Sequence, residues 1–228
     1  MSVHVGSAIG PSMLIERKER GRMATVYRAD DSLDSAEQVI HALAAAVEAK
    51  DPHTEAHTQR VAASARRIGV RMGLPPEDLE ALYRGGIIHD IGKIGVPDEI
   101  LLKPSALDPD ETDRMQQHPL IGENIVAPLQ TGASLLAMIR HHHEHYDGSG
   151  YPDGLAGDRI PLLARIVSVC DAYDAMTSDR PYRRGQSPEQ AMAVLRQGAG
   201  GQWDPQIVQL MVEELRRPTD RVQRAMAQ

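Results

Sequence analysis

The chain of 228 residues contains no phenylalanine, and aromatic residues make up only 3% of it. Strands depend on aromatic and β-branched side chains, so this scarcity favours packed helices with a core of Leu, Ile, Val, Ala and Met. The single cysteine, Cys170, excludes an internal disulfide and a cysteine-rich zinc module. Both absences are typical of a helical protein from a reducing compartment.

Long apolar runs and an excess of positive charge are also missing. No stretch has the length of a membrane-spanning helix, and the first residues lack the features of a secretion signal. The net charge is −7, which disfavours broad binding to DNA, RNA or anionic lipid. With 41% hydrophobic residues, we expect a soluble, globular, cytoplasmic protein that is not attached to a membrane.

Apolar residues at helical spacing are abundant from about residue 34 onward. Cap signals, such as Asp108 with Glu111, mark several helix starts. Helices are expected from about residue 34, over 54–72, from 76 up to His89, and near 110–127, 132–145, 161–177, 187–198 and 204–217. No alternation of helices with buried strands interrupts the series, so the pattern predicts an all-α bundle. Residues 1–32 form an N-terminal extension of unassigned role, with a charged run at 16–20 and a β-capable stretch at 24–27.

His89 and Asp90 stand side by side in an aliphatic segment, residues 85–97 (GGIIHDIGKIGVP). A buried carboxylate needs a partner, and divalent metals take both imidazole nitrogen and carboxylate oxygen as ligands. Lys93 adds a positive charge near whatever such a metal binds. Alternatively, His89 caps a helix carbonyl and Asp90 pairs with Lys93, and for this pair alone that interpretation is favoured.

Histidines are crowded into the middle of the chain, with eight of the ten between residues 53 and 145. Candidate ligands on successive helical segments are His53, His57, His118, His141, His142, His143, Asp171 and Asp174. Any one histidine is as readily a surface or core residue as a ligand. Jointly, these side chains predict a multi-metal centre inside a helical bundle.

Such a centre, without a nucleophilic cysteine or a Ser-His-Asp pattern, indicates attack by metal-activated water. Two cations roughly 3.5 to 4 Å apart can hold a bridging hydroxide near neutral pH. Phosphorus esters suit this chemistry, because metals and guanidinium groups hold the charge on their oxygens. Arg180, Arg183 and Arg184 lie in one loop after Asp171 and are candidates for phosphate binding, with a basic turn at a helix end as the alternative.

Four segments then occur in the order and spacing of a known family: residues 89–93 (HDIGK), 142–144 (HHE), 147–152 (DGSGYP) and 171–182. Over about residues 34–217 the chain resembles the HD-GYP subgroup of HD-domain phosphohydrolases. Members are bacterial metal-dependent phosphodiesterases that open the second messenger cyclic di-GMP to linear pGpG and often continue to GMP. The resemblance implies an all-α HD-domain bundle with a Gly-Tyr-Pro loop, a catalytic domain over residues 33–220 and a C-terminal tail over 221–228.

The resemblance also implies roles for individual residues. The implied metal ligands are His57, His89, Asp90, His118, His142, His143 and Asp171, with Asp90 as the bridging, catalytic ligand. Lys93 would contact and polarise the substrate phosphate, and Tyr151 would line the substrate site. Arg180 and Arg183 would hold the phosphates. Gly150, Tyr151 and Pro152 would form the loop that binds a partner such as a diguanylate cyclase of the GGDEF type, and a homodimer is a further expectation.

One position departs from the family pattern. Members credited with a third metal carry Glu four residues before the first ligand histidine, where this chain has His53. Two divalent ions are therefore expected, iron or manganese before zinc or nickel, and His53 stays open as a further ligand. Two other functions also stay open: an HD phosphohydrolase of another cyclic or linear nucleotide, and a weakly active module that binds cyclic di-GMP.

Overall fold

The computed structural model describes residues 8–9, 12–20, 25–29, 35–50, 55–129, 132–179 and 184–217. The chain forms two compact units, Met1–Val39 and Ile40–Gln228. The first unit contains a three-stranded antiparallel sheet in the order β1-β2-β3. Its strands are β1 (Ala8–Ile9), β2 (Ser12–Arg20) and β3 (Thr25–Ala29). Strand β3 overlaps the β-capable stretch. Strand β2 contains the charged run, which has no alternating apolar pattern from which a strand could be predicted.

The second unit is built from helices, as predicted. The α-helices of the described chain are α1 (Ser35–Lys50), α2 (Glu55–Met72), α3 (Pro76–Ile88), α4 (Asp98–Leu101), α5 (Pro109–Met115), α6 (His118–Val126), α7 (Ala133–His141), α8 (Leu162–Thr177), α9 (Pro188–Gly198) and α10 (Pro205–Arg216). Short 3-10 helices are η1 (Ile91–Gly95), η2 (Ala127–Leu129) and η3 (Gly157–Arg159). None of the described helices is long and apolar enough to cross a membrane.

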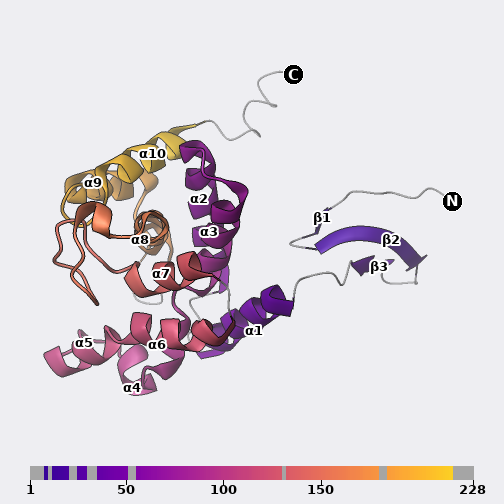
Figure 1. Ribbon diagram of the computed structural model, residues 1–228, viewed down its shortest axis with the longest axis horizontal. Coiled ribbons are helices and arrows are strands. Elements are labelled where there is room, and N and C mark those ends of the chain that lie inside the picture. Colours follow the sequence, from indigo (N-terminus) through magenta and orange to yellow (C-terminus); the bar gives the residue numbers. More distant parts are fainter. Residues whose placement is uncertain are drawn as a thin grey trace. The chain divides into compact units, whose positions relative to one another are not determined.

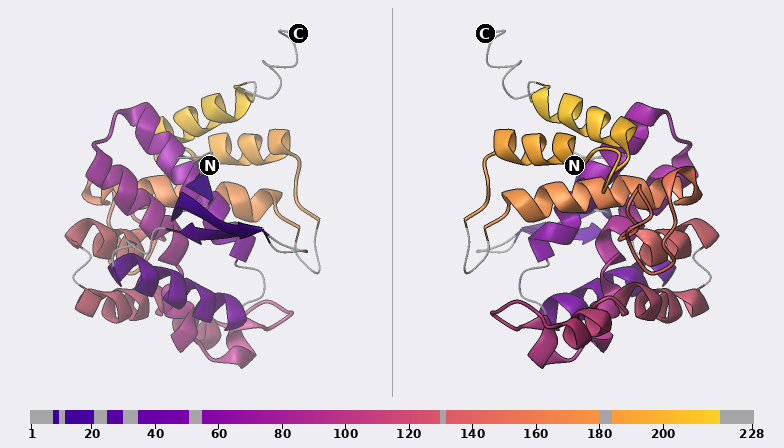
Figure 2. Two further views of the ribbon diagram at one scale, coloured as in Figure 1. Left: turned by 90° about the vertical axis from the view of Figure 1, so that its right-hand side faces the viewer. Right: turned by 90° about the vertical axis from the view of Figure 1, so that its left-hand side faces the viewer.

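Helix α8 is the element around which the second unit packs. It contacts α2, α3, α7, α9 and α10, and Figure 1 shows it enclosed by them. Both views in Figure 2 show α9 and α10 at one end of this unit and α4 to α6 at the other. Ile166 and Val167 of α8 are fully buried, and burying each such side chain contributes about 1.5–3 kcal/mol.

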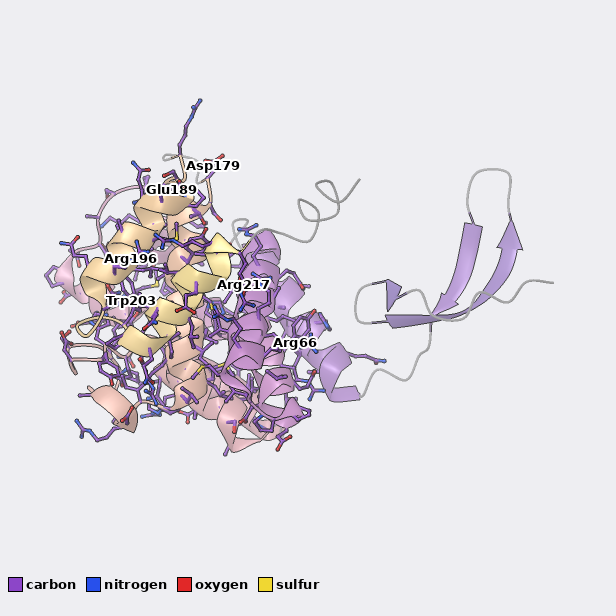
Figure 3. The ribbon with its side chains drawn as sticks, turned by 90° about the horizontal axis from the view of Figure 1, so that it is seen from above. Arg66, Asp179, Glu189, Arg196, Trp203 and Arg217 are labelled. Carbon is purple, nitrogen blue, oxygen red and sulfur yellow. The ribbon has the colours of Figure 1, made fainter. Side chains whose placement is uncertain are left out.

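The core has the aliphatic composition that the lack of phenylalanine predicts. Apart from Cys170 and Trp203, the buried hydrophobic residues among those described are Ile, Leu, Val, Ala and Met. Trp203, which is labelled in Figure 3 beside α9 and α10, is buried as a core residue. Packed helices therefore supply the hydrophobic core without large aromatic clusters.

Cap chemistry locates several helix starts correctly. Asp108 and Ser187 each form a capping box with the residue three positions later, and Asp204 caps α10. The single helix expected near residues 110–127 is wrong, because the chain breaks at Gln116 and Gln117 into α5 and α6. The break puts His118 at the first position of a new helix.

Candidate metal centre

His89 and Asp90 form the turn between α3 and η1, and both are buried. Gly92, two residues after Asp90, allows η1 to approach the start of α6 closely. A Cβ atom at Gly92 would lie 1.8 Å from the carbonyl oxygen of His118, so no larger residue fits without moving backbone. The close approach brings His118 to Asp90.

Lys50, at the end of α1, holds the C-terminal end of the segment that contains Asp90 and Lys93. Its Nζ donates to the carbonyl oxygens of Ile94 at 2.9 Å and Val96 at 2.5 Å. Both carbonyls lie within three residues after Lys93, so the last turn of α1 helps to position the segment that carries Lys93. The sequence offered no signal for this contact, because 44 residues separate Lys50 from Ile94.

Three buried histidines share one orientation. Nδ1 of His89 lies 3.0 Å from the carbonyl oxygen of Gly86. Nδ1 of His118 lies 2.8 Å from the carbonyl oxygen of Met115, and Nδ1 of His142 lies 2.8 Å from that of Ile139. Each carbonyl belongs to the last turn of a helix, where it has no partner within the helix. Because Nδ1 donates its proton to the carbonyl, the hydrogen-bond pattern assigns the free lone pair to Nε2, on the side of Asp90.

These side chains converge on Asp90 in two groups. Nε2 of His118 and Nε2 of His142 lie 3.3 and 3.7 Å from Oδ1 of Asp90, and Nε2 of His89 lies 3.5 Å from Oδ2. One group of potential ligands is Asp90, His118, His142 and His143; the other is His57, His89 and Asp90. Within each group the ligand atoms lie within 4.8 Å of one another. Asp90 is the member that the two groups share.

Asp171 lies beside the second group. Its Oδ1 is 3.2 Å from Nε2 of His57 and 3.9 Å from Nε2 of His89. Asp174, one turn later on α8, lies behind the imidazole, with Oδ2 2.7 Å from Nδ1 of His57. Of the two aspartates that the sequence singled out here, only Asp171 therefore faces the Nε2 side of His57.

The donor set fits a divalent cation. His89 Nε2 and Asp90 Oδ1 are buried and have no hydrogen-bond partner among the described residues. Nε2 of His118 and Nε2 of His142 face each other at 3.4 Å with their lone pairs. One cation in each ligand group would satisfy these atoms, with Asp90 shared between the two groups. The alternative interpretation names two contacts that do occur, His89 to a carbonyl and Asp90 to Lys93 at 2.6 Å, but they leave these atoms unpaired.

The imidazoles respond differently to their surroundings. Burial lowers the pKa of His89 and lowers that of His143 well below its usual value, so both are neutral, as metal ligation requires. Burial also acts to lower the pKa of His57, but hydrogen bonds with Asp171 and Asp174 outweigh it and raise that pKa to about 9. The position of His57 between two carboxylates therefore favours positive charge in the metal-free protein, and a cation bound at Nε2 would take the place of that proton.

The carboxylates are held in the ionised form. Burial acts to raise the pKa of Asp90, but the positive charge of Lys93 acts against it, and that pKa is held well below its usual range. Asp171 behaves likewise, since the hydrogen bond with His57 overcomes burial and lowers its pKa. The buried Asp90 and the partly exposed Asp171, both ionised, give the site the negative charge that binds cations.

The Gly-Tyr-Pro loop is anchored directly on the histidine cluster. The ring of Tyr151 stacks on that of His143 with centroids 4.9 Å apart and planes 25° apart. The buried carboxylate of Glu144 accepts hydrogen bonds from the backbone N–H groups of Asp153 at 2.8 Å and Leu155 at 3.0 Å. The motif predicts no separate role for Glu144, although the position of Glu144 next to the histidine pair is a usable signal for one.

Some of the predicted site residues lie outside the described residues: His53, Arg180 and Arg183. Asp179, labelled in Figure 3, is the last described residue before the two arginines. Nine other candidates, His57, His89, Asp90, Lys93, His118, His142, His143, Tyr151 and Asp171, are brought together in the second unit, whereas His141 lies in a separate group with Glu144 and Asp153.

Comparisons with known proteins identify the family. Residues 41–207 match the HD domain family, and the chain belongs to it. The chain is 40% identical over 180 residues to the cyclic di-GMP phosphodiesterase response regulator RpfG of Xanthomonas campestris, covering 77% of this chain and 47% of that protein. It is 37% identical over 170 residues to the 3'3'-cGAMP-specific phosphodiesterase 3 of Vibrio cholerae, covering 75% of this chain and 37% of that protein.

A solved structure agrees with the fold. The HDG"Y"P protein of Bdellovibrio bacteriovorus matches with a TM-score of 0.62 at 20% identity, over 81% of this chain and 62% of that one. The resemblance to the HD-GYP proteins drawn from the motifs is thereby confirmed. The chain spans half or less of the length of the curated relatives described above.

Proposed function

We propose that residues 33–220 form a metal-dependent phosphodiesterase domain that hydrolyses cyclic di-GMP to linear pGpG, with GMP as a further product. The observation that carries the proposal is the pair of ligand groups that share Asp90, in which His89 Nε2 and Asp90 Oδ1 are buried without partners among the described residues. A relative named as a cyclic di-GMP phosphodiesterase supports the choice of substrate.

Two divalent ions are proposed. Mixed imidazole and carboxylate ligation accommodates iron or manganese, which are the first choice, and also zinc or nickel. The proposed ligands are His57, His89, Asp90, His118, His142, His143 and Asp171, and His53 is the candidate for a third ion. When bound, the ions would supply an activated water and stabilise negative charge on phosphate oxygens.

The remaining roles belong to side chains around this centre. Lys93, which bonds Asp90 at 2.6 Å, is proposed to hold and polarise the substrate phosphate from the partly exposed edge of the site. Tyr151 is proposed to line the substrate site, since its ring lies against His143. Arg180 and Arg183 are proposed phosphate contacts on the strength of their motif alone.

The competing function is hydrolysis of another cyclic dinucleotide, which the relative named as specific for 3'3'-cGAMP favours. A module that binds cyclic di-GMP with little turnover is the other alternative. A cytoplasmic location, a homodimer and a GGDEF-type partner at Gly150, Tyr151 and Pro152 are part of the same proposal. The partner surface is supported by the exposure of the neighbouring Asp153 and Gly154 at the loop.

Chromatography of reaction products tests these alternatives. Protein purified without air and loaded with Mn²⁺ is incubated separately with cyclic di-GMP, 3'3'-cGAMP and cyclic di-AMP, with Asp90→Ala as the inactive control. Linear pGpG formed fastest from cyclic di-GMP supports the proposal. Faster hydrolysis of another dinucleotide favours the second function, and binding of cyclic di-GMP without any product favours the module.

A further inference from the structure

His57 differs from the other three oriented histidines in its place on its helix. His89, His118 and His142 lie next to helix C-terminal turns, whose free carbonyls accept their Nδ1 protons. His57 is the third residue of α2, and the first turn of a helix has free N–H groups but no free carbonyls. The partner for Nδ1 of His57 must therefore come from a different element.

Asp174 of α8 is that partner, and it is itself held on several sides. Its Oδ2 lies 2.7 Å from Nδ1 of His57, and it accepts from Nη2 of Arg60 at 2.8 Å and from Oγ of Ser178 at 3.0 Å. Its Oδ1 accepts from Nε of Arg60 at 2.5 Å. Arg60 is three residues after His57 on α2, so both side chains lie on one face of the helix and both contact the carboxylate of Asp174.

We propose that Asp174, held in place by Arg60, is a positioning residue that orients the imidazole of His57 for metal binding. This inference rests on the proposed metal centre. A carboxylate at Nδ1 keeps the proton on that nitrogen, aims Nε2 at the site and makes the imidazole a stronger donor than a carbonyl does. The two ligand groups thus differ, since His118 and His142 of the other group are oriented by carbonyls.

The bidentate contact with Arg60 explains how a carboxylate can be placed there. Asp174 is largely buried, and a buried carboxylate without charged partners is costly. Arg60 engages both oxygens in the planar arrangement that guanidinium groups favour, which leaves Oδ2 directed at the imidazole. Lysine at this position would keep the charge but lose the two-pronged contact.

The test is a Mn²⁺ titration of metal-free protein by calorimetry, with bound metal counted by elemental analysis. We expect two Mn²⁺ ions per wild-type chain. In Asp174→Asn, one ion should bind with unchanged affinity and the other about 10–100-fold more weakly. Arg60→Lys should weaken the same ion to a smaller extent, and it provides the test if Asp174→Asn does not fold.

Asp204→Asn is the matched control, because Asp204 is also buried and accepts from Arg165 of α8 at 2.6 Å, and its hydrogen bonds with described residues involve no candidate ligand. It should lower the melting temperature and leave both Mn²⁺ affinities unchanged. If the Asp174 and Arg60 variants behave like this control, Asp174 has only a structural role and the inference is overturned. If wild-type protein binds no Mn²⁺, the proposed metal centre fails instead.

Discussion

Nε2 of His118 lies 3.3 Å from Oδ1 of Asp90, an oxygen that is buried and has no hydrogen-bond partner among the described residues. Two acceptor atoms at this separation repel each other unless a positive charge lies between them. The pair joins the turn before η1 to α6 and belongs to the larger of the two ligand groups that contain Asp90. Asp90 is thus the residue whose loss should affect both groups.

Replacing Asp90 by Asn should remove most of the bound metal. The amide has similar size but no charge, and its NH₂ group would face an imidazole or a cation. We expect metal content to fall from two ions to fewer than one per chain, and kcat/KM for cyclic di-GMP to fall about 10³-fold or more. Elemental analysis and product chromatography measure the two effects. An Asp90→Asn variant with two ions and full turnover would refute the shared-ligand assignment.

Replacing Gly92 by Ala should separate the two halves of the site. The new Cβ would meet the carbonyl oxygen of His118 at 1.8 Å and the backbone nitrogen of Gly122 at 2.6 Å, and neither is a flexible side chain. We expect a loss of about 3 kcal/mol in the free energy of unfolding, at the upper end of overpacking costs, together with weaker metal binding.

Gly73→Ala is the control for this change. Gly73 has a positive φ of 70°, but a Cβ atom there would meet nothing within 4 Å, so only the conformational cost of about 1 kcal/mol should appear. Urea unfolding compares the two variants. Equal losses of stability, with metal binding intact in both, would show that the contact between η1 and α6 is not essential.

Replacing Glu144 by Ala should loosen the Gly-Tyr-Pro loop. The buried carboxylate accepts from the N–H groups of Asp153 and Leu155, and its removal leaves both donors unpaired. We expect a loss of about 1–3 kcal/mol and faster amide hydrogen exchange over residues 148–157. Asp147→Asn, which keeps an oxygen for the Ser149 N–H, should retain wild-type exchange. Unchanged exchange in Glu144→Ala would contradict the anchoring role.

Local features of the fold could be predicted from the sequence, whereas contacts between distant segments could not. Cap pairs such as Asp108 with Glu111 are local, so they located helix starts correctly. The break before His118 was missed, although Pro119 at the start of α6 was a signal for it. The hydrogen bond between His57 and Asp174 joins residues 117 apart in the chain, and only the packing of α2 on α8 reveals it.

Replacing Lys93 by Met should separate substrate activation from metal binding. Lys93 bonds Asp90 at 2.6 Å but offers no lone pair to a cation, and methionine fills similar space without the charge. Without the ammonium group, Asp90 loses a competing ion pair, so its affinity for the metal should stay equal or rise. If the ammonium also holds the substrate phosphate, kcat/KM should fall about 10²–10³-fold. Lys103→Met, which removes the charge paired with Glu111 away from the site, should keep full activity. Metal loss in parallel with activity in Lys93→Met would show that Lys93 only supports Asp90.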